Sequence, residues 1–188
     1  MEWILTPLAF LVANHLVGPT ILFASACIAF HSVRKQVETS RKKATLDLIV
    51  KTESEEYFQR NYAEFRELSK RNELEALAKN TDRDDDEQSI KSTIDDFLNH
   101  YELTALSIRK GILDEGTYKE WMRSTLIAHY EASADYIQVV RDNPGKPGEY
   151  PDAYTEFENL AIAWRAGRNI ISNRTRLEKL RAWAKHKT

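Results

Sequence analysis

The sequence predicts an all-α protein in which one N-terminal transmembrane helix continues into, or is followed by, a cytosolic multi-helix bundle. First, the segment 3–30 has no charged side chain over more than the ~20 residues that cross a bilayer core. Second, no glycine or proline lies between Pro19 and Gly111, so nothing there enforces a chain reversal. Third, apolar residues recur every three or four positions, as in the series Ile90, Ile94, Phe97, Tyr101 and Ala105.

The charges that flank the apolar segment predict its orientation. No lysine or arginine precedes the segment, whereas basic residues follow it at Arg34, Lys35, Arg41, Lys42 and Lys43. By the positive-inside rule, the protein lies in a bacterial inner membrane with its N-terminus outside and its C-terminal domain in the cytosol. We therefore expect a transmembrane helix at 1–32, a cytosolic helical domain at 33–188, and contact between the five basic side chains and the lipid surface.

Polar residues inside the apolar segment bear on what surrounds this helix in the membrane. Asn14 and His15 are costly in lipid unless they face another helix or a water-filled cavity. One interpretation is a homo-oligomer in which Asn14, His15 and Ser25 line a shared axis or pore, with Ser25 and Ala29 allowing close helix approach. The alternative is a plain anchor in which His15 is neutral and bonds to nearby backbone. Pro19 predicts a kink, because proline removes a helical hydrogen bond.

The first half of the cytosolic domain is expected to hold two helices. A long helix is predicted over about 33–79, because no breaker interrupts its apolar stripe. The acidic run 82–87 then predicts a solvated loop. The next helix is expected to begin at an N-cap residue, either Asp86 or Ser89. It should end at Gly111, since glycine suits the position just past a helix end.

The second half is expected to hold three helices. The first restarts at Asp114, or at Thr117 through its capping-box spacing to Glu120, and runs to about Val140. Residues 143–148 are rich in proline and glycine and predict a loop. Two further helices are expected at about 151–165 and 168–187. The last is basic with an apolar face, so it suits anionic lipid, RNA phosphates, or packing on the bundle beside the acidic loop.

One pair of residues has the spacing of a known catalytic motif. Arg123 and His129 resemble the Arg-x(4-6)-His motif of HEPN ribonucleases, in which such pairs from two subunits cleave RNA without a metal. Six residues place the two side chains about 120° apart on one helix. His129 also falls on the apolar stripe with Trp121 and Thr125. The alternative interpretation is therefore a histidine at the edge of the core.

The rest of the sequence gives little indication of a metal site, a cofactor site or a catalytic motif. Cys27 is the single cysteine, and neither His100 nor His129 has the i, i+4 pairing with glutamate that a metal site on a helix would use. No glycine-rich phosphate loop or nucleophile elbow is present, so we expect no metal or cofactor and do not favour an enzyme. The net charge is −2, so RNA is not an expected partner for the chain as a whole.

Several segments between 42 and 164 resemble a bacterial family of small single-pass membrane proteins with a helical domain of unknown function. They are the segments 94–102, 109–115, 120–121 and 157–160. The resemblance implies an all-helical fold and a membrane topology but assigns no catalytic residues. The overall plan is also similar to the pore-forming accessory membrane protein of type VI-B RNA-targeting CRISPR systems. That likeness implies a pore in phage defence, with Arg123 and His129 in structural roles.

These observations favour a non-enzymatic, self-associating inner-membrane protein whose cytosolic domain holds subunits together or docks a protein effector. Its membrane helices are expected to form an oligomeric pore in phage defence or stress. A membrane-tethered HEPN-like ribonuclease is the first alternative. A passive membrane scaffold is the second.

Overall fold

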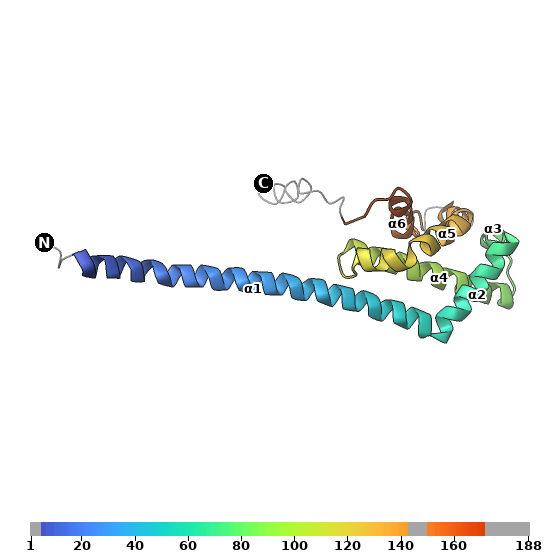
Figure 1. Ribbon diagram of the computed structural model, residues 1–188. Helices are drawn as coiled ribbons and strands as arrows, with labels where there is room; N and C mark the ends of the chain where they lie inside the picture. The colour runs from blue at the N-terminus through green and yellow to red at the C-terminus, as the bar shows by residue number, and fades with distance from the viewer. Residues whose placement is uncertain (1–4, 143–149, 172–188) are drawn as a thin grey trace. The chain divides into compact units, whose positions relative to one another are not determined.

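The computed structural model describes residues 5–142 and 150–171, with side chains from Pro19 onward. Over these residues it contains six helices and no strand, which confirms the all-α class (Figure 1). The contacts divide the chain into two compact units, Met1–Ser40 and Arg41–Thr188. The helices are α1 (Leu5–Ser54), α2 (Glu56–Arg71), α3 (Leu74–Lys79), α4 (Asp85–Arg109), α5 (Glu115–Asp142) and α6 (Thr155–Arg165).

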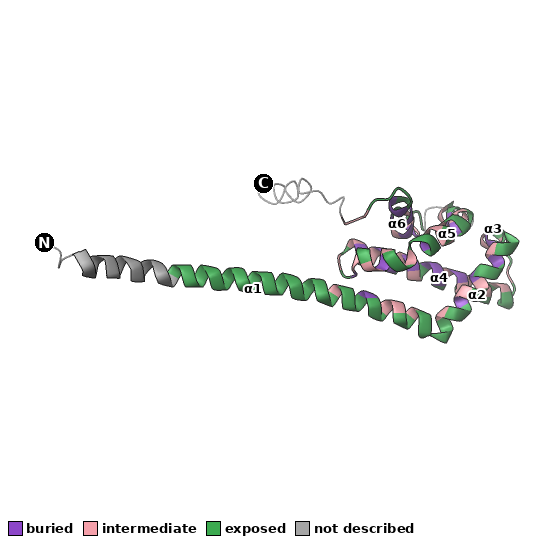
Figure 2. Cartoon of the chain, in the orientation of Figure 1, coloured by how far each residue is buried: buried purple, intermediate pink, exposed green. Residues whose placement is uncertain are grey.

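The first unit consists of the N-terminal part of α1. Every described side chain from Pro19 to Ser40 is exposed, as the green colour of α1 in Figure 2 shows. The exposed side chains include large apolar ones, such as Leu22 at 72% and Phe23 at 73% exposure. Helix α1 continues through Pro19, so this proline does not end the helix.

None of the helices in the described residues combines the length and the apolar character needed to cross a membrane. The predicted span 3–30 is only partly covered by this finding. Trp3 lies outside the described residues, as do the side chains of Asn14 and His15. Ser25 is described and is exposed on α1.

The predicted long helix over 33–79 is wrong, because the chain changes direction twice within it. Glu55 adopts an extended conformation with φ −79° and ψ 118°, and α2 ends at Asn72 in the left-handed region with φ 57°. The turn at Glu55 lets Phe65 of α2 pack on Phe97 of α4, with ring centroids 4.5 Å apart. Tertiary packing therefore bends a segment that has no local breaker.

The core of the second unit is built around α4, which packs against α2 and α6, while α5 packs against α3 and α6. The predicted apolar stripe of α4 is confirmed, since its inward residues are at most 1% exposed: Ile94, Phe97, Leu98, Tyr101, Ala105 and Ile108. Full burial of each large side chain stabilises the fold by about 1.5–3 kcal/mol. Side chains of α6 complete the core, notably Phe157, Leu160 and Trp164.

The ends of α4 and the start of α5 follow local sequence signals. The N-cap of α4 is Asp84, whose carboxylate accepts a hydrogen bond from the Glu87 amide, so neither Asp86 nor Ser89 has this role. Gly111 follows the end of α4 with φ +72°, as predicted. Helix α5 begins at Glu115. Of the two proposed starts, Asp114 is the cap, and its carboxylate accepts hydrogen bonds from both the amide and the hydroxyl of Thr117.

The C-terminal predictions are met in part. Helix α6 ends at Arg165 as expected but begins at Thr155, because residues 151–154 form a turn. Residues 168–171 are not helical, so the predicted helix at 168–187 does not begin at Arg168. The rest of that helix and the predicted loop at 143–148 lie outside the described residues.

Candidate functional site

An aromatic cleft opens in the second unit where the end of α1, the start of α2, α4 and α5 meet. We use this name for a hollow of about 310 Å³ lined by Glu53, Phe58, Gln59, Tyr62, Tyr101, Trp121, Met122, Thr125 and His129. An adjoining hollow of about 10 Å³ shares five of these residues and adds Ile49, Thr52, His100 and Tyr118. The cleft is thus walled mainly by aromatic side chains.

The last turns of α1 are fixed beside this cleft by two residues one helical turn apart. Thr45 is completely buried; its hydroxyl donates to the Arg41 carbonyl and accepts from the Asp114 amide, both at 2.8 Å. The guanidinium of Arg41 donates to the Leu113 carbonyl at 3.2 Å. Glu53 lies about two helical turns after Thr45 and lines the cleft.

His129 forms the inner wall of the cleft inside a cluster of aromatic rings. Its ring centroid lies 5.2–5.6 Å from those of Tyr62, Phe65, Phe97 and Tyr101. Its Nδ1 lies 2.8 Å from the Tyr101 hydroxyl oxygen, within hydrogen-bonding distance. Burial lowers the pKa of His129 from 6.5 to about 4. The imidazole is therefore neutral at pH 7.

His100 lies beside the cleft and is also neutral. Its ring meets the Phe58 ring edge-on, with centroids 4.6 Å apart. Burial lowers the pKa of His100 to about 4, although the Glu55 carboxylate opposes the change. Burial also raises the pKa of Tyr101 well above its usual range, and the Glu53 carboxylate adds to that rise.

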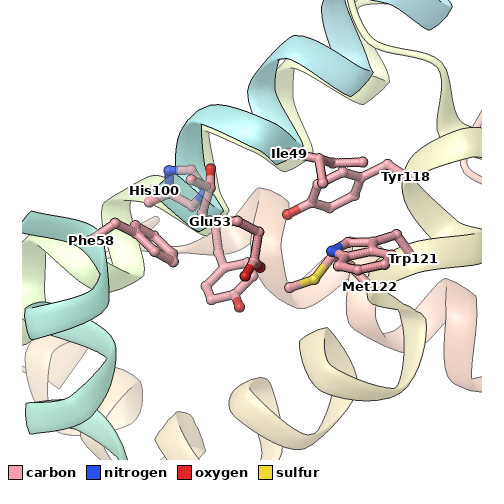
Figure 3. Close-up of a pocket in the computed structure, with 9 residues that line it drawn as sticks. Ile49, Glu53, Phe58, His100, Tyr118, Trp121 and Met122 are labelled. Carbon is pink, nitrogen blue, oxygen red and sulfur yellow. The ribbon is translucent and has the colours of Figure 1, made fainter. Parts of the chain in front are cut away.

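Within the described part of the chain, Glu53 is therefore the one residue with a charged side chain that lines the aromatic cleft, since His129 is neutral. Figure 3 shows its side chain extending between Phe58 and His100 on one side and Trp121 and Met122 on the other. Among the described residues Glu53 forms no ion pair, whereas the neighbouring Glu55 pairs with Lys51. An aromatic hollow with one carboxylate is chemically suited to a positively charged group.

The side chains of Arg123 and His129, the predicted pair, contact two different helices. The guanidinium of Arg123 donates from Nε and Nη2 to the Trp164 carbonyl of α6, at 3.2 and 3.0 Å. His129 instead faces Tyr101 of α4. The two side chains thus tie α5 to different helices, as their angular separation on one helix predicts.

The residues predicted to bind the membrane surface differ in their surroundings. Lys35, Lys42 and Lys43 are exposed, and the Arg34 guanidinium lies 5.3 Å from the centre of the Phe30 ring. Arg41 is half-buried through its bond to Leu113, so it also serves to position α1. No group of three or more histidine, cysteine, aspartate or glutamate residues in the described part of the chain could hold a metal ion.

Sequence reasoning missed two carboxylates that organise α6. Glu102 of α4 accepts hydrogen bonds from the amides of Glu156 and Phe157, at 3.1 and 2.8 Å, and so caps the N-terminus of α6. Glu115 is 3% exposed and accepts three N–H groups, from the Trp164 indole at 3.0 Å and the amides of Ile170 and Ile171. No local pattern marks these long-range acceptors. Glu102 and Glu115 do lie in two of the segments, 94–102 and 109–115, that resemble the family with a domain of unknown function.

A second hollow, of about 570 Å³, is lined by more charged side chains than the aromatic cleft. Its central carboxylate, Asp95, accepts hydrogen bonds from the hydroxyls of Tyr136 and Tyr154, at 2.5 and 3.2 Å, and pairs with Lys91. Another lining residue, Glu102, is bonded to the backbone of α6. These acidic groups already have partners within the fold, so the aromatic cleft is the better candidate for a ligand.

The fold and the cleft together define a small helical domain that carries an exposed apolar N-terminal helix. Residues 19–164 match a family model described as a domain of unknown function, DUF4760, and the chain belongs to this family. The resemblance to a family with a domain of unknown function is thereby confirmed. Comparisons with curated proteins and with solved structures found no match.

Proposed function

We propose that this chain is a self-associating, single-pass inner-membrane protein whose cytosolic helical domain binds a protein partner. In this proposal the membrane helices line a pore that acts in phage defence or stress. The observation that carries it is the row of uncovered apolar side chains on α1, exposed by 53–73%: Ile21, Leu22, Phe23, Ile28, Phe30, Val33 and Val37. A contiguous apolar surface of this kind is unfavourable in water and favours burial in lipid or against other copies.

The charges at the end of this row support the proposed orientation. Arg34 and Lys35 follow the apolar segment, and Arg34 lies against the ring of Phe30 one turn earlier. A long basic side chain can bury its methylene groups beside apolar surface while its charge remains in the headgroup layer. In the proposal, Lys42 and Lys43 then contact the same anionic surface.

The contacts of Arg123 and His129 favour the non-enzymatic form of the proposal over a ribonuclease. A general acid-base histidine works best with a pKa near the operating pH, whereas that of His129 is lowered to about 4. The Arg123 guanidinium is directed to a backbone carbonyl of α6. Both residues have a structural use that explains their presence without RNA cleavage.

Membrane insertion is tested by paired polar substitutions. Replacing Leu22 and Phe23 together by Gln should release much of the protein from the membrane fraction, because two apolar side chains would have to enter lipid as amides. Leu103→Gln with Ile112→Gln is the matched control, since these side chains are 64% and 60% exposed on the helical domain. The measurement is the share of protein left in membranes after an alkaline wash. Equal behaviour of the two pairs would refute membrane insertion through α1.

A further inference from the structure

We propose that the aromatic cleft binds a cationic side chain, arginine or lysine, presented by the protein partner. This inference names the partner's chemistry, and so it rests on the part of the proposed function in which the helical domain binds a protein. It does not depend on a pore or on membrane insertion. The cleft lies wholly within the unit Arg41–Thr188.

The charges of the cleft favour a cation over an anion or a neutral group. Among the residues that the structure describes, its lining contains one carboxylate, Glu53, and no lysine or arginine. The nearby Glu55 is a second carboxylate whose charge acts on the neighbouring His100, although it also pairs with Lys51. An entering cation would therefore find a carboxylate that lacks an ion pair among the described residues, while an anion would be repelled.

The aromatic walls suit the same ligand. The half-buried Phe58 and Tyr62 line the cleft together with the buried Tyr101, and the indole of Trp121, also in the lining, is 58% exposed. Faces of aromatic rings attract guanidinium and ammonium groups through the ring quadrupole. The methylene part of an arginine or lysine side chain would pack on Met122 and the rings.

The size and openness of the cleft favour a side chain held on a larger surface. About 310 Å³ is at the small end of ligand sites, and it is large enough for one arginine or lysine side chain. The exposed edge of Trp121 leaves this side of the cleft accessible. Partially exposed tryptophan is also common at the centres of protein interfaces.

The test is calorimetric titration of the full chain, solubilised in a non-ionic detergent, with Nα-acetyl-arginine methylamide. We expect saturable binding with a dissociation constant on the order of 1 mM, as suits one side chain. The matched ligand is the citrulline analogue, which has nearly the same shape but no charge. It should bind at least about tenfold more weakly. Equal binding of the two ligands, or no saturable binding of the arginine ligand, would overturn the proposal.

Two variants locate the binding in the aromatic cleft. Glu53→Gln should weaken arginine binding about tenfold, because it removes the charge with little change of shape. Asp135→Asn is the control, since Asp135 is an exposed carboxylate of α5 that does not line the cleft, and it should bind like the unaltered chain. Unchanged affinity in Glu53→Gln would overturn the proposal.

A second pair of variants keeps the test decisive if Glu53→Gln disturbs folding. Trp121 is largely exposed, so its substitution should leave the core intact. Trp121→Phe preserves an aromatic face and should retain binding, whereas Trp121→Leu should reduce affinity several-fold. Equal affinity of these two variants would contradict the proposal. Because the ligand is a single blocked amino acid, this result is independent of the membrane fractionation that tests α1.

Discussion

The two half-buried histidines at the aromatic cleft, His100 and His129, should make the domain less stable in acid. The pKa of His129 and of His100 is about 4 in the folded state against 6.5 as the ordinary value. The unfolded chain therefore takes up protons first as the pH falls, and the folded state loses stability between about pH 6.5 and pH 4. Each histidine contributes up to about 3 kcal/mol to this loss.

His129→Gln should roughly halve this pH dependence, because glutamine keeps a polar group near the Tyr101 hydroxyl but does not titrate. The measurement is the free energy of urea unfolding at several pH values between 4 and 7. His31→Gln, at an exposed position of α1, is the control and should follow the unaltered chain. A slope that stays the same in His129→Gln would show that this imidazole is not the group responsible.

Among the helices, α6 illustrates how one element depends on side chains of another. Tyr154 precedes it with φ 58° and provides no side-chain cap. The Glu102 carboxylate of α4 accepts the free amides of the first turn instead. An acceptor with negative charge at this position also interacts favourably with the positive end of the helix dipole.

Glu102→Gln should therefore destabilise the domain by about 2 kcal/mol, since it weakens two charge-assisted hydrogen bonds to backbone. Faster hydrogen exchange at the amides of Glu156 and Phe157 should accompany the loss. Glu131→Gln is the control, because it removes only an exposed ion pair with Arg165 at the other end of α6, worth about 0–1 kcal/mol. Equal losses in the two variants would contradict the capping role.

The accuracy of the sequence predictions varied with the range of the interactions involved. The end of α4 just before Gly111 and a restart at Asp114 or Thr117 were predictable, because a left-handed glycine and an N-cap residue are local signals. The bend at Glu55 was not, since it depends on aromatic packing between α2 and α4. The aromatic cleft could not be predicted either, because Glu53 and His129 line a common cleft only once the fold is formed.

For the molecule as a whole, the proposed pore and the alternative ribonuclease predict opposite outcomes for two double substitutions. Asn14→Leu with His15→Leu should abolish pore activity, because the polar lining is lost, and should spare RNA cleavage. Arg123→Lys with His129→Gln should leave a pore intact and abolish cleavage. The measurements are dye release from cells and RNA degradation, made on the same cultures. Loss of pore activity only in the second pair would refute the proposed lining.

Oligomeric mass gives an independent control for that comparison. The detergent-solubilised chain should be larger than a monomer, since a pore needs several copies and a HEPN-like site needs two. A monomer of unaltered chain would refute the pore and count strongly against the ribonuclease. A passive scaffold would be indifferent to both double substitutions.

The bonds of Arg41 and Thr45 to the turn between α4 and α5 have a practical consequence for anyone who wishes to crystallise the helical domain separately. Helix α1 ends at Ser54, which suggests the start of α2 as a convenient place to shorten the chain. Such a cut would remove the buried Thr45 hydroxyl and leave the Asp114 amide without its acceptor. It would also delete Glu53 from the cleft. A useful fragment therefore has to begin before Arg41.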